Sequence, residues 1–399
     1  MSPMKKSYKF RIYPKQAEEA IMQIVLNTCR TLYNDSLADR KEEYKRDKTS
    51  LNYYDQANTL TATKADFPSL KETHSQVLQD VLRRLDKAYQ NFFRRVKQGE
   101  KPGFPRFKGY DRYDSFTYPQ NGWKFIGDKK LKLAKIGVVK IKLHRNIPKS
   151  ATIKTCTVKK EGNQWYAVFS LEIPDQEKSV KSEIHNPIGI DLGIKELATL
   201  SNGEKIHNPK WLRESQKKLA NEQRRLSRKR KGSQNRKKQK AKVQEVYRKI
   251  KNQRSDFLHK VSNELVQTYD LIIFEDLKIK NMVKNHFLAK SIFDASWNQL
   301  VSYTTYKAEG AGKVVELINP KGTSQECSSC GATVPKTLAV RVHKCPHCGL
   351  IMDRDENAAK NILARSKYYG VPQGLREFTP VEILSRGSLK QDAPCFSTG

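Results

Sequence analysis

Hydrophobic patterns in the first half of the chain predict strands mixed with long helices. Residues 8–13 alternate as a strand does, and the proline that follows ends the pattern. Helical periodicity runs over residues 15–45 and returns over residues 70–97. Three further strands are expected, the last two joined as a hairpin by a glycine-containing turn: residues 140–143, 152–158 and 165–173.

A change of pattern near residues 175–185 predicts a boundary between two lobes, because this stretch is charged and lacks periodicity. Residues 1–182 are therefore expected to form an α+β lobe, a small β-barrel interrupted by helices over about residues 15–100. Residues 99–119 mix Pro, Gly, basic and aromatic side chains, which is typical of an ordered surface loop.

Short apolar strands and a long polar helix alternate in the second lobe. Residues 187–203 predict two strands around a Gly-containing turn, and residues 211–260 predict a helical stretch broken at Gly232-Ser233 into a hairpin. A strand, a helix, a strand and a last helix follow, at residues 269–277, 291–307, 313–318 and 355–369. From residue 370 we expect a flexible tail.

The charge balance points to a polyanionic partner. The chain has 76 Lys and Arg against 42 Asp and Glu, a net charge of +34 that phosphate contacts would neutralise. Between Arg213 and Arg254 there are 18 basic residues and three Glu, so the predicted hairpin is expected to contact nucleic acid. No apolar run approaches the roughly 18 residues of a membrane-spanning helix, and no signal peptide is expected.

Three carboxylates stand where predicted strands and helices begin or end. Asp191 lies inside PIGIDLG between Ile190 and Leu192, Glu275 ends LIIFE, and Asp355 opens DRDENAAKNIL. Converging carboxylates repel one another, and Mg²⁺ relieves that repulsion while binding phosphate oxygens. Two such ions about 4 Å apart would support phosphodiester hydrolysis. This order of acids along the chain is that of an RNase H-like nuclease.

Each acid also has a simpler interpretation. Asp191 could be a turn residue, Glu275 a solvated strand end beside Asp276, and Asp355 a helix N-cap. Asp353 competes with Asp355 for the third position. The joint occurrence of the acids in so basic a chain favours the catalytic interpretation.

Four of the seven cysteines form two CxxC pairs separated by 14 residues. Cys327, Cys330, Cys345 and Cys348 predict one structural, four-thiolate zinc site. A glycine follows each pair and lets the chain turn. Four thiolates leave no open position for catalysis, and a redox role would need only one pair. The remaining cysteines stand alone, which is typical of a reducing compartment, and we expect the cytosol.

Other candidate nucleic-acid contacts lie on the second helical stretch, in the aromatic segment and on the basic hairpin. Aromatic side chains interleaved with cations can stack on bases, although packing of these aromatics into the barrel is an equal alternative. The candidates are Gln76, Gln79, Arg83, Arg84, Arg106, Lys108, Arg224, Arg228, Lys229, Arg236 and Lys237.

The motifs taken together resemble TnpB (OrfB), the transposon-encoded relative of type V CRISPR effector nucleases. The resemblance covers about residues 5–369 and rests on several segments: YKFRIYPKQ, LYNDSLADR, KPGFPRFKGYDRYDSFTYP, GIDLGIKELATLSNG, LSRKRKGSQNRKKQ, IIFEDLKIKNM, GTSQECSSCG, CPHCG and DRDENAAKNILA. The three acids match the family's catalytic acids and the four cysteines its zinc ligands.

The resemblance implies a domain order. A wedge-like barrel with a REC-like helical bundle occupies residues 1–182, and a RuvC-like domain of RNase H type begins at residues 183–320, with the basic hairpin at 211–260. A zinc ribbon is inserted at residues 321–350, and residues 351–369 complete the RuvC-like domain.

The resemblance also implies an activity. A noncoding RNA from the transposon right end would guide one protein chain per RNA to double-stranded DNA beside a short flanking motif, in the prokaryotic cytosol and at the nucleoid. A single site with two Mg²⁺ ions would cut both strands. Alternatives are a compact type V effector with a CRISPR-derived guide, a guided DNA-binding regulator that does not cut, and a plain nucleic-acid-binding protein.

Overall fold

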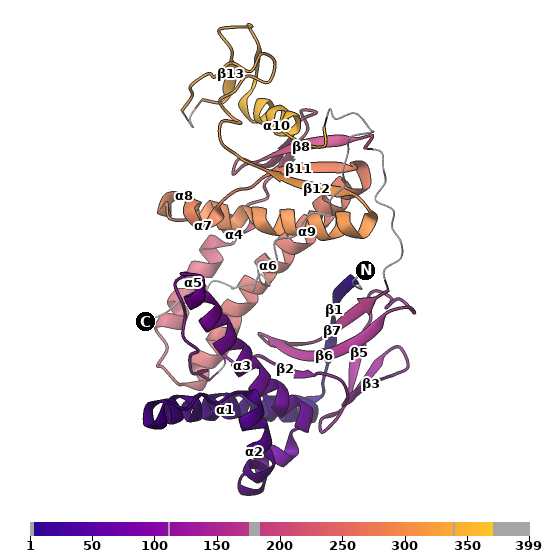
Figure 1. Cartoon of the computed structure of the whole chain (residues 1–399), viewed down its shortest axis with the longest axis vertical. Helices are drawn as coiled ribbons and strands as arrows, with labels where there is room; N and C mark the ends of the chain where they lie inside the picture. Colours follow the sequence, from indigo (N-terminus) through magenta and orange to yellow (C-terminus); the bar gives the residue numbers. More distant parts are fainter. Residues whose placement is uncertain (1–3, 111, 175–183, 338–339, 370–399) are drawn as a thin grey trace. The chain divides into compact units, whose positions relative to one another are not determined.

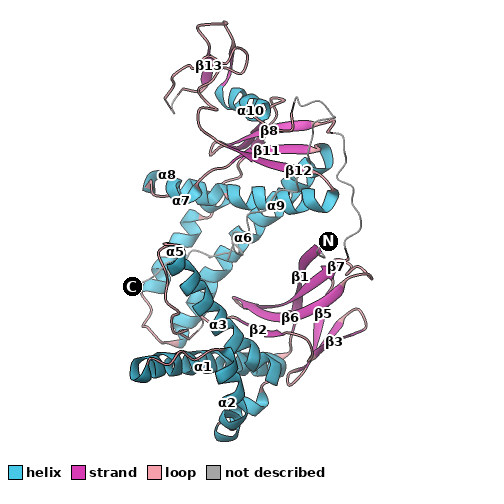
Figure 2. Cartoon of the chain, viewed as in Figure 1, coloured by secondary structure: helices cyan, strands magenta, loops and turns pink. Residues whose placement is uncertain are grey.

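Two β-sheets, each with its own core, organise the computed structural model (Figures 1 and 2), which describes residues 4–110, 112–174, 184–337 and 340–369. The chain divides into two units, Met1–Gln176 and Glu177–Gly399. Most of the expected boundary stretch at residues 175–185 and the expected tail from residue 370 lie outside the described residues.

Unit 1 contains a seven-stranded antiparallel sheet of order β2-β6-β7-β1-β5-β4-β3. Its two end strands, β2 and β3, are consecutive in the chain, so the sheet is near-closed, as the expected barrel requires. The strands are β1 (Met4–Tyr13), β2 (Ser115–Tyr118), β3 (Trp123–Ile126), β4 (Lys130–Leu133), β5 (Gly137–Lys142), β6 (Thr152–Glu161) and β7 (Gln164–Ile173).

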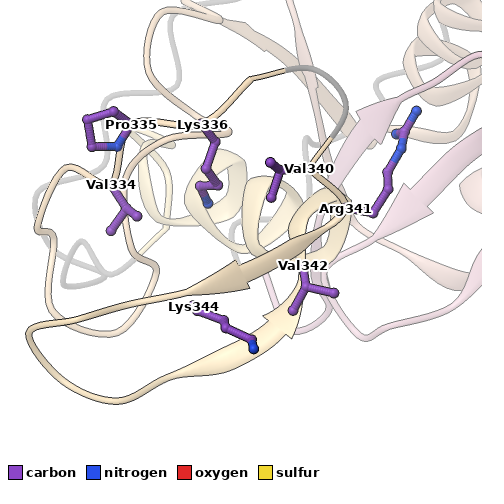
Figure 3. A pocket seen from close by; sticks show the side chains of 7 residues that line it. All are labelled: Val334, Pro335, Lys336, Val340, Arg341, Val342 and Lys344. Atoms are coloured by element: carbon purple, nitrogen blue, oxygen red, sulfur yellow. The ribbon is translucent and has the colours of Figure 1, made fainter.

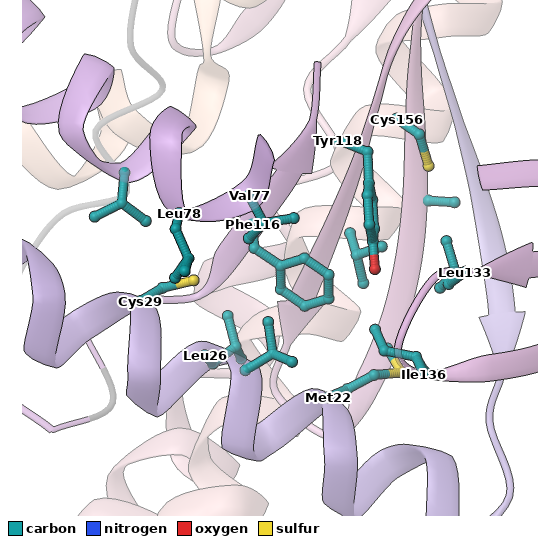
Figure 4. Close-up of a cluster of buried hydrophobic side chains, with 14 of the residues drawn as sticks. Met22, Leu26, Cys29, Val77, Leu78, Phe116, Tyr118, Leu133, Ile136 and Cys156 are labelled. Carbon is teal, nitrogen blue, oxygen red and sulfur yellow. The ribbon is translucent and has the colours of Figure 1, made fainter. Parts of the chain in front are cut away.

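Helices cover one side of this sheet: α1 (Gln16–Asp47), α2 (Tyr53–Asp66), the 3₁₀ turn η1 (Pro68–Glu72) and α3 (Ser75–Lys97). Figure 4 shows the core between them, where Cys29 of α1 lies near Leu78 of α3 and Met22 of α1 lies near Ile136. Phe116 and Tyr118 fill the same core from β2. The prediction of a surface loop over residues 99–119 is therefore wrong at its C-terminal end, where alternation was hidden among Pro and Gly.

Unit 2 contains a five-stranded sheet of order β10-β9-β8-β11-β12. The first three strands pair antiparallel, while β11 runs parallel to both β8 and β12. The strands are β8 (Pro187–Leu192), β9 (Glu196–Leu200), β10 (Lys205–His207), β11 (Leu271–Glu275) and β12 (Val314–Ile318).

Helices pack on both faces of this sheet, as Figure 1 shows for α9 and α10. Ile190 and Phe274 pack among α6 and α9 on one face, whereas Leu271 and Ile273 meet Ile362 of α10 on the other. The helices are α4 (Trp211–Glu214), α5 (Gln216–Ser227), α6 (Gln234–Thr268), α7 (Ile279–Met282), α8 (His286–Ala295), α9 (Trp297–Ala311) and α10 (Arg354–Ala364).

The break expected in the basic helix is present between α5 and α6. Gly232 has a positive φ of 85°, which only glycine adopts readily, and the Ser233 side chain caps α6 by accepting from the backbone N–H of Arg236. Helix α6 continues to Thr268, beyond the expected end at residue 260, because its later turns pack on the sheet.

A short antiparallel pair, β13 (Val342–Lys344) and β14 (Ile351–Asp353), lies in the chain between β12 and α10. Among the residues that the structure describes, no helix is both long and apolar enough to cross a membrane.

Candidate active site

The register of two parallel strands brings the first two carboxylates together. Ile190 of β8 lies opposite Phe274 of β11, so the next residues along each strand are Asp191 and Glu275. Parallel neighbours in register point to the same face of the sheet, with backbones about 4.8 Å apart. The two carboxylates therefore stand side by side.

Helix α10 brings the third carboxylate to the same face. A Cβ at Gly189 would lie 2.2 Å from the carbonyl oxygen of Ala359 and 2.6 Å from the backbone nitrogen of Leu363. Only glycine admits so close an approach, which seats α10 on β8 at the face that Asp191 also occupies. Asp355 lies one helical turn before Ala359, at the Asp191 end of this contact.

Asp191 is influenced electrostatically by both other acids. Burial first, and then the negative charges of Glu275 and Asp355, hold the pKa of Asp191 well above its ordinary value of 3.8, against the opposing charge of Arg354. Burial also raises the pKa of Glu275, and the hydrogen bond from Thr323 acts in the opposite direction. A divalent cation would offset this repulsion, so the donor set fits Mg²⁺.

The structure separates the roles of Asp353 and Asp355. Asp353 is the N-cap of α10: its Oδ1 accepts from the backbone N–H groups of Asp355 and Glu356, and its Oδ2 accepts from Lys205 at 2.8 Å. Although burial opposes the change, these bonds lower the pKa of Asp353. The N-cap interpretation therefore applies to Asp353, and Asp355 remains the candidate ligand.

Two guanidinium groups hold Asp355 in place. Arg354 donates to its Oδ1 at 3.0 and 3.2 Å, and Arg341 approaches its Oδ2 at 3.5 Å. Arg354 also donates to the carbonyl oxygen of Val340. Sequence reasoning passed over both arginines, although Arg354 stands inside the DRD motif.

A polar face of α10 holds the backbone on both sides of Cys327 in place. This face was not predicted from the sequence. Asn357 accepts from the backbone N–H of Ser328 and donates to the carbonyl oxygen of Glu326, and Asn361 donates to Glu326 and Thr323 carbonyls at 2.8 Å. Thr323 in turn donates its hydroxyl to Glu275 Oε1 at 2.6 Å. Two buried asparagines at i and i+4 in one helix were the available signal.

The four predicted cysteines form a compact sulfur cluster. Cys327, Cys330, Cys345 and Cys348 have Sγ atoms within 4.8 Å of one another, the arrangement that a tetrahedral zinc site needs. Among the described residues, the three carboxylates do not meet this spacing as a group. The predicted glycine turns are present at Gly331 and Gly349, with φ of 75° and 76°.

The pKa values of Cys327 and Cys345 are lowered, which favours the thiolate form that zinc binds. Burial acts to raise the pKa of Cys327, but hydrogen bonds from the backbone N–H groups of Cys330 and Ser329, and from His343, outweigh it and lower the pKa to about 7. The chemistry of the donor set therefore fits zinc.

A shallow pocket lies on the segment between the two cysteine pairs. Figure 3 shows its lining, which combines apolar and basic side chains: Val334, Pro335, Lys336, Val340, Arg341, Val342 and Lys344. Lys336 contacts Nδ1 of the buried His343, while Arg341 is the residue that reaches Asp355. This lining offers no carboxylate, so it is no metal site of its own.

The structure places most candidate nucleic-acid contacts at the surface. Those that are exposed are Arg83, Arg106, Arg224, Arg228, Lys229 and Lys237, and those that are half-buried are Gln76, Gln79 and Lys108. Gln76 accepts from the backbone N–H of Asn121, and the backbone of Lys108 exchanges hydrogen bonds with Asn34.

Two predicted contacts have structural roles instead. Arg84 turns into unit 1, donating to Asp80 and to Ser115 and Thr117 of β2. Arg236 donates to the carbonyl oxygens of Leu226 and Lys229, which closes the turn between α5 and α6. Some basic side chains donate hydrogen bonds to buried or helix-terminal acceptors, and others contact phosphate. The sequence alone does not distinguish the two kinds.

Comparison with family models places the chain among transposon-encoded proteins. The OrfB model of IS605 elements, described as "Probable transposase", matches residues 168–286. A "Cas12f1-like, TNB domain" model matches residues 297–362, and a "Helix-turn-helix domain" model matches residues 1–49. In the described part of that last segment the structure has one strand and one long helix.

Relatives extend the match to the full chain. A Streptomyces pristinaespiralis protein, named for RNA-guided DNA endonuclease activity, is 34% identical over 100% of this chain and 99% of its own length. InsQ of Escherichia coli K12, named for the same activity, is 32% identical over 90% of this chain and 91% of its own length. The chain belongs to the TnpB (OrfB) family.

A solved structure shares the fold. The protein in a cryo-EM structure of the Cas12f1–sgRNA–target DNA complex superposes with a TM-score of 0.55 at 14% identity, over 90% of this chain and 98% of that one.

Proposed function

We propose that this protein is an RNA-guided DNA endonuclease that cuts DNA at a single Mg²⁺-dependent, RuvC-like site formed by Asp191, Glu275 and Asp355. The convergence of these three acids on one face of one sheet carries the proposal. Its support is the parallel register of β8 and β11, the contact of α10 at Gly189, and the raised pKa of Asp191. The relatives' names point to the same activity.

The topology of the sheet supports the RNase H-like assignment. Three antiparallel strands followed by two parallel ones, in the order 3-2-1-4-5, place the first and fourth strands side by side at the centre. The acids then come from the first strand, the fourth strand and the last helix. We assign residues 183–320 and 351–369 to this domain and residues 321–350 to an inserted zinc ribbon.

In the proposed mechanism, Asp191 would hold the metal ions together with Glu275 and Asp355, the two acids whose charges raise its pKa. Two Mg²⁺ ions bound there would activate water and stabilise the leaving oxygen of the phosphodiester. Thr323 orients Glu275, and the N-cap bonds of Asp353 hold Asp355 at the start of α10. Arg354 and Arg341 contact Asp355 and orient its carboxylate.

The cysteine cluster would hold one zinc ion in a structural role. The four sulfur atoms, which lie within 4.8 Å of one another, would supply all four ligands of such a site and leave no position for a reacting water. We further propose that the guide is a transposon right-end RNA bound by one chain, and that the exposed cations of α5 and α6 contact its phosphates.

Purification of the protein with its RNA tests the function. The RNA is sequenced, and a plasmid library matching its guide is offered with Mg²⁺ or with EDTA. We expect both strands to be cut in Mg²⁺ only, and the Asp191→Ala variant to keep the RNA without cutting. Absence of copurifying RNA, or equal cutting by Asp191→Ala, would overturn the proposal. Cutting only with a CRISPR-derived guide would support a type V effector instead.

A further inference from the structure

Aromatic side chains are exposed together at the C-terminal end of α3 and in the segment that follows it. This aromatic patch consists of Tyr89, Phe92, Phe93, Phe104 and Phe107. Phe93, Phe104 and Phe107 are 56%, 44% and 51% exposed. Ring centroids lie 5.2 Å apart for Phe92 and Phe93 and for Phe92 and Phe104, so these three rings are in contact, and the Lys41 ammonium lies near both Phe104 and Phe107. Exposed aromatic side chains that gather in this way are candidates for a binding site.

Contacts of the chain around Pro105 keep the aromatic rings of this segment at the surface. Pro105 is buried, while Phe104 and Phe107 on either side of it face outward. Three residues after the proline, the Asn34 side chain exchanges two hydrogen bonds with the backbone of Lys108, at 2.7 and 3.0 Å. The rings are therefore presented on a fixed segment, which lowers the entropy lost on binding.

Cations surround the patch and define the chemistry of its partner. The Nζ atom of Lys41 lies 5.0 Å from the Phe107 ring and 5.9 Å from the Phe104 ring. The flanking exposed cations are Arg94, Arg95, Lys97, Lys101 and Arg106. The nearby acid Glu100 pairs with Arg95 at 3.9 Å. Flat apolar rings among cations fit unpaired nucleotides, which offer a base to stack and a phosphate to pair.

We propose that the aromatic patch binds an unpaired segment of the guide RNA by stacking on its bases. Paired bases are inaccessible to such rings, so a duplex does not fit. Guide RNA is the occupant to which the inference commits, because the proposed function gives the protein a bound RNA before any DNA target is present. This inference rests on the proposed function for the identity of its ligand.

Crosslinking identifies the ligand at the patch. The RNA–protein complex is isolated from cells grown with 4-thiouridine, irradiated, and digested for peptide mapping. We expect RNA crosslinks on peptides that contain residues 92–107. Crosslinks elsewhere but none there would overturn the proposal. Crosslinks at the patch from 4-thiothymidine in the target DNA alone, or to a second protein, would equally overturn it.

Affinity for a labelled 20-nucleotide oligouridylate RNA tests stacking itself. The Phe93→Ala, Phe107→Ala double variant should bind at least about tenfold more weakly with an unchanged salt slope, and Phe107→Trp should retain binding. Arg106→Ala should instead reduce the salt slope by about one. The matched control is Phe67→Ala, a 60%-exposed phenylalanine of unit 1 outside the patch. Unchanged affinity in the double variant, with an unchanged unfolding temperature, would overturn the proposal.

The two proposals fail separately. Oligouridylate binding does not need the carboxylates, so a protein that binds RNA through the patch and never cuts DNA would disprove the endonuclease assignment alone. A protein that cuts guided targets while the double variant binds oligouridylate normally would disprove the patch alone.

Discussion

At the scale of single residues, Asp191 is a carboxylate whose charged form is disfavoured by burial and by the nearby charges of Glu275 and Asp355. Its folded-state pKa lies above 3.8, so the stabilisation that protonation brings is complete below about pH 3.8 and is lost as the pH rises through the raised value. We expect Asp191→Asn to raise the unfolding temperature of the metal-free protein by about 2–4 °C at neutral pH.

Thermal unfolding in EDTA and in Mg²⁺, from about pH 4 to about pH 8, measures this effect. Saturating Mg²⁺ should reverse the order, because the wild type alone gains from the bound ion. If the wild-type protein has a higher unfolding temperature than Asp191→Asn in EDTA at neutral pH, this result would contradict the clustering of the three acids.

Thr323 controls the second carboxylate through a single hydrogen bond. Because its hydroxyl bond to Glu275 opposes the effect of burial, Thr323→Val should raise the pKa of Glu275 further. We expect about a tenfold to hundredfold loss of Mg²⁺ affinity, larger at lower pH, measured from the Mg²⁺ dependence of cleavage.

Thr304→Val is the matched control, since that buried hydroxyl donates to the Leu300 carbonyl oxygen within α9. An equal loss in both variants would indicate a general packing defect and remove the role assigned to Thr323.

At the scale of elements, the contact of α10 with β8 depends on one glycine. A methyl group at Gly189 meets backbone atoms of α10 at 2.2 and 2.6 Å, so the helix must move. We expect Gly189→Ala to lower the free energy of unfolding by about 1–3 kcal/mol or more and to abolish cleavage, although all three acids remain. Gly109→Ala, where nothing lies within 4 Å, is the control. Normal cleavage by Gly189→Ala would disprove the placement of Asp355 by this contact.

The basic hairpin contains two kinds of arginine that one assay distinguishes. Arg228 is exposed, and Arg228→Ala should reduce the salt slope of RNA binding by about 0.7–0.9 without loosening the hairpin. Arg236 bonds two carbonyl oxygens, so Arg236→Ala should instead increase amide hydrogen exchange at the α5–α6 turn. Identical behaviour of the two variants in both measurements would contradict this division.

Hydrophobic periodicity predicted the strands and helices that bury one regular face. It missed the elements that bury few residues or are very short. Strands β1, β6, β7, β8, β9, β11 and β12 alternate or are apolar throughout, and each was expected. Helix α2 buries little besides Leu60, and its capping box of Asn52 and Asp55 was the stronger signal. Strands β3 and β4 have only four residues each, too few for alternation to be distinctive.

The sequence predicted which residues form the candidate site but not how they are arranged in space. The three acids and four cysteines follow from local sequence and motif spacing. The choice between Asp353 and Asp355 depends on which residue caps α10, and helix ends are uncertain by one or two positions in sequence. Thr323 acts on Glu275, 48 residues away in the chain, so no local pattern shows it, whereas the i and i+4 spacing of Asn357 and Asn361 in α10 was a local signal.

At the scale of the whole molecule, the cysteine cluster should influence a reaction that it does not touch. Removal of zinc with a chelator that leaves Mg²⁺ in place should lower both the unfolding temperature of unit 2 and the rate of cleavage. Calorimetry and cleavage at fixed free Mg²⁺ measure the two effects, and Cys345→Ser should reproduce them. Full activity after verified zinc loss would contradict a structural role for the cluster.

Hydrogen bonds run from Ser328 in the cysteine cluster through Asn357, Asn361 and Thr323 to Glu275, and so connect the two candidate sites. If bound zinc steadies this chain and so favours Mg²⁺ binding, then bound Mg²⁺ must tighten zinc binding by the same factor, because linkage is reciprocal. Each ion would act as an effector of the other, and depletion of one in the cell would lower occupancy of both.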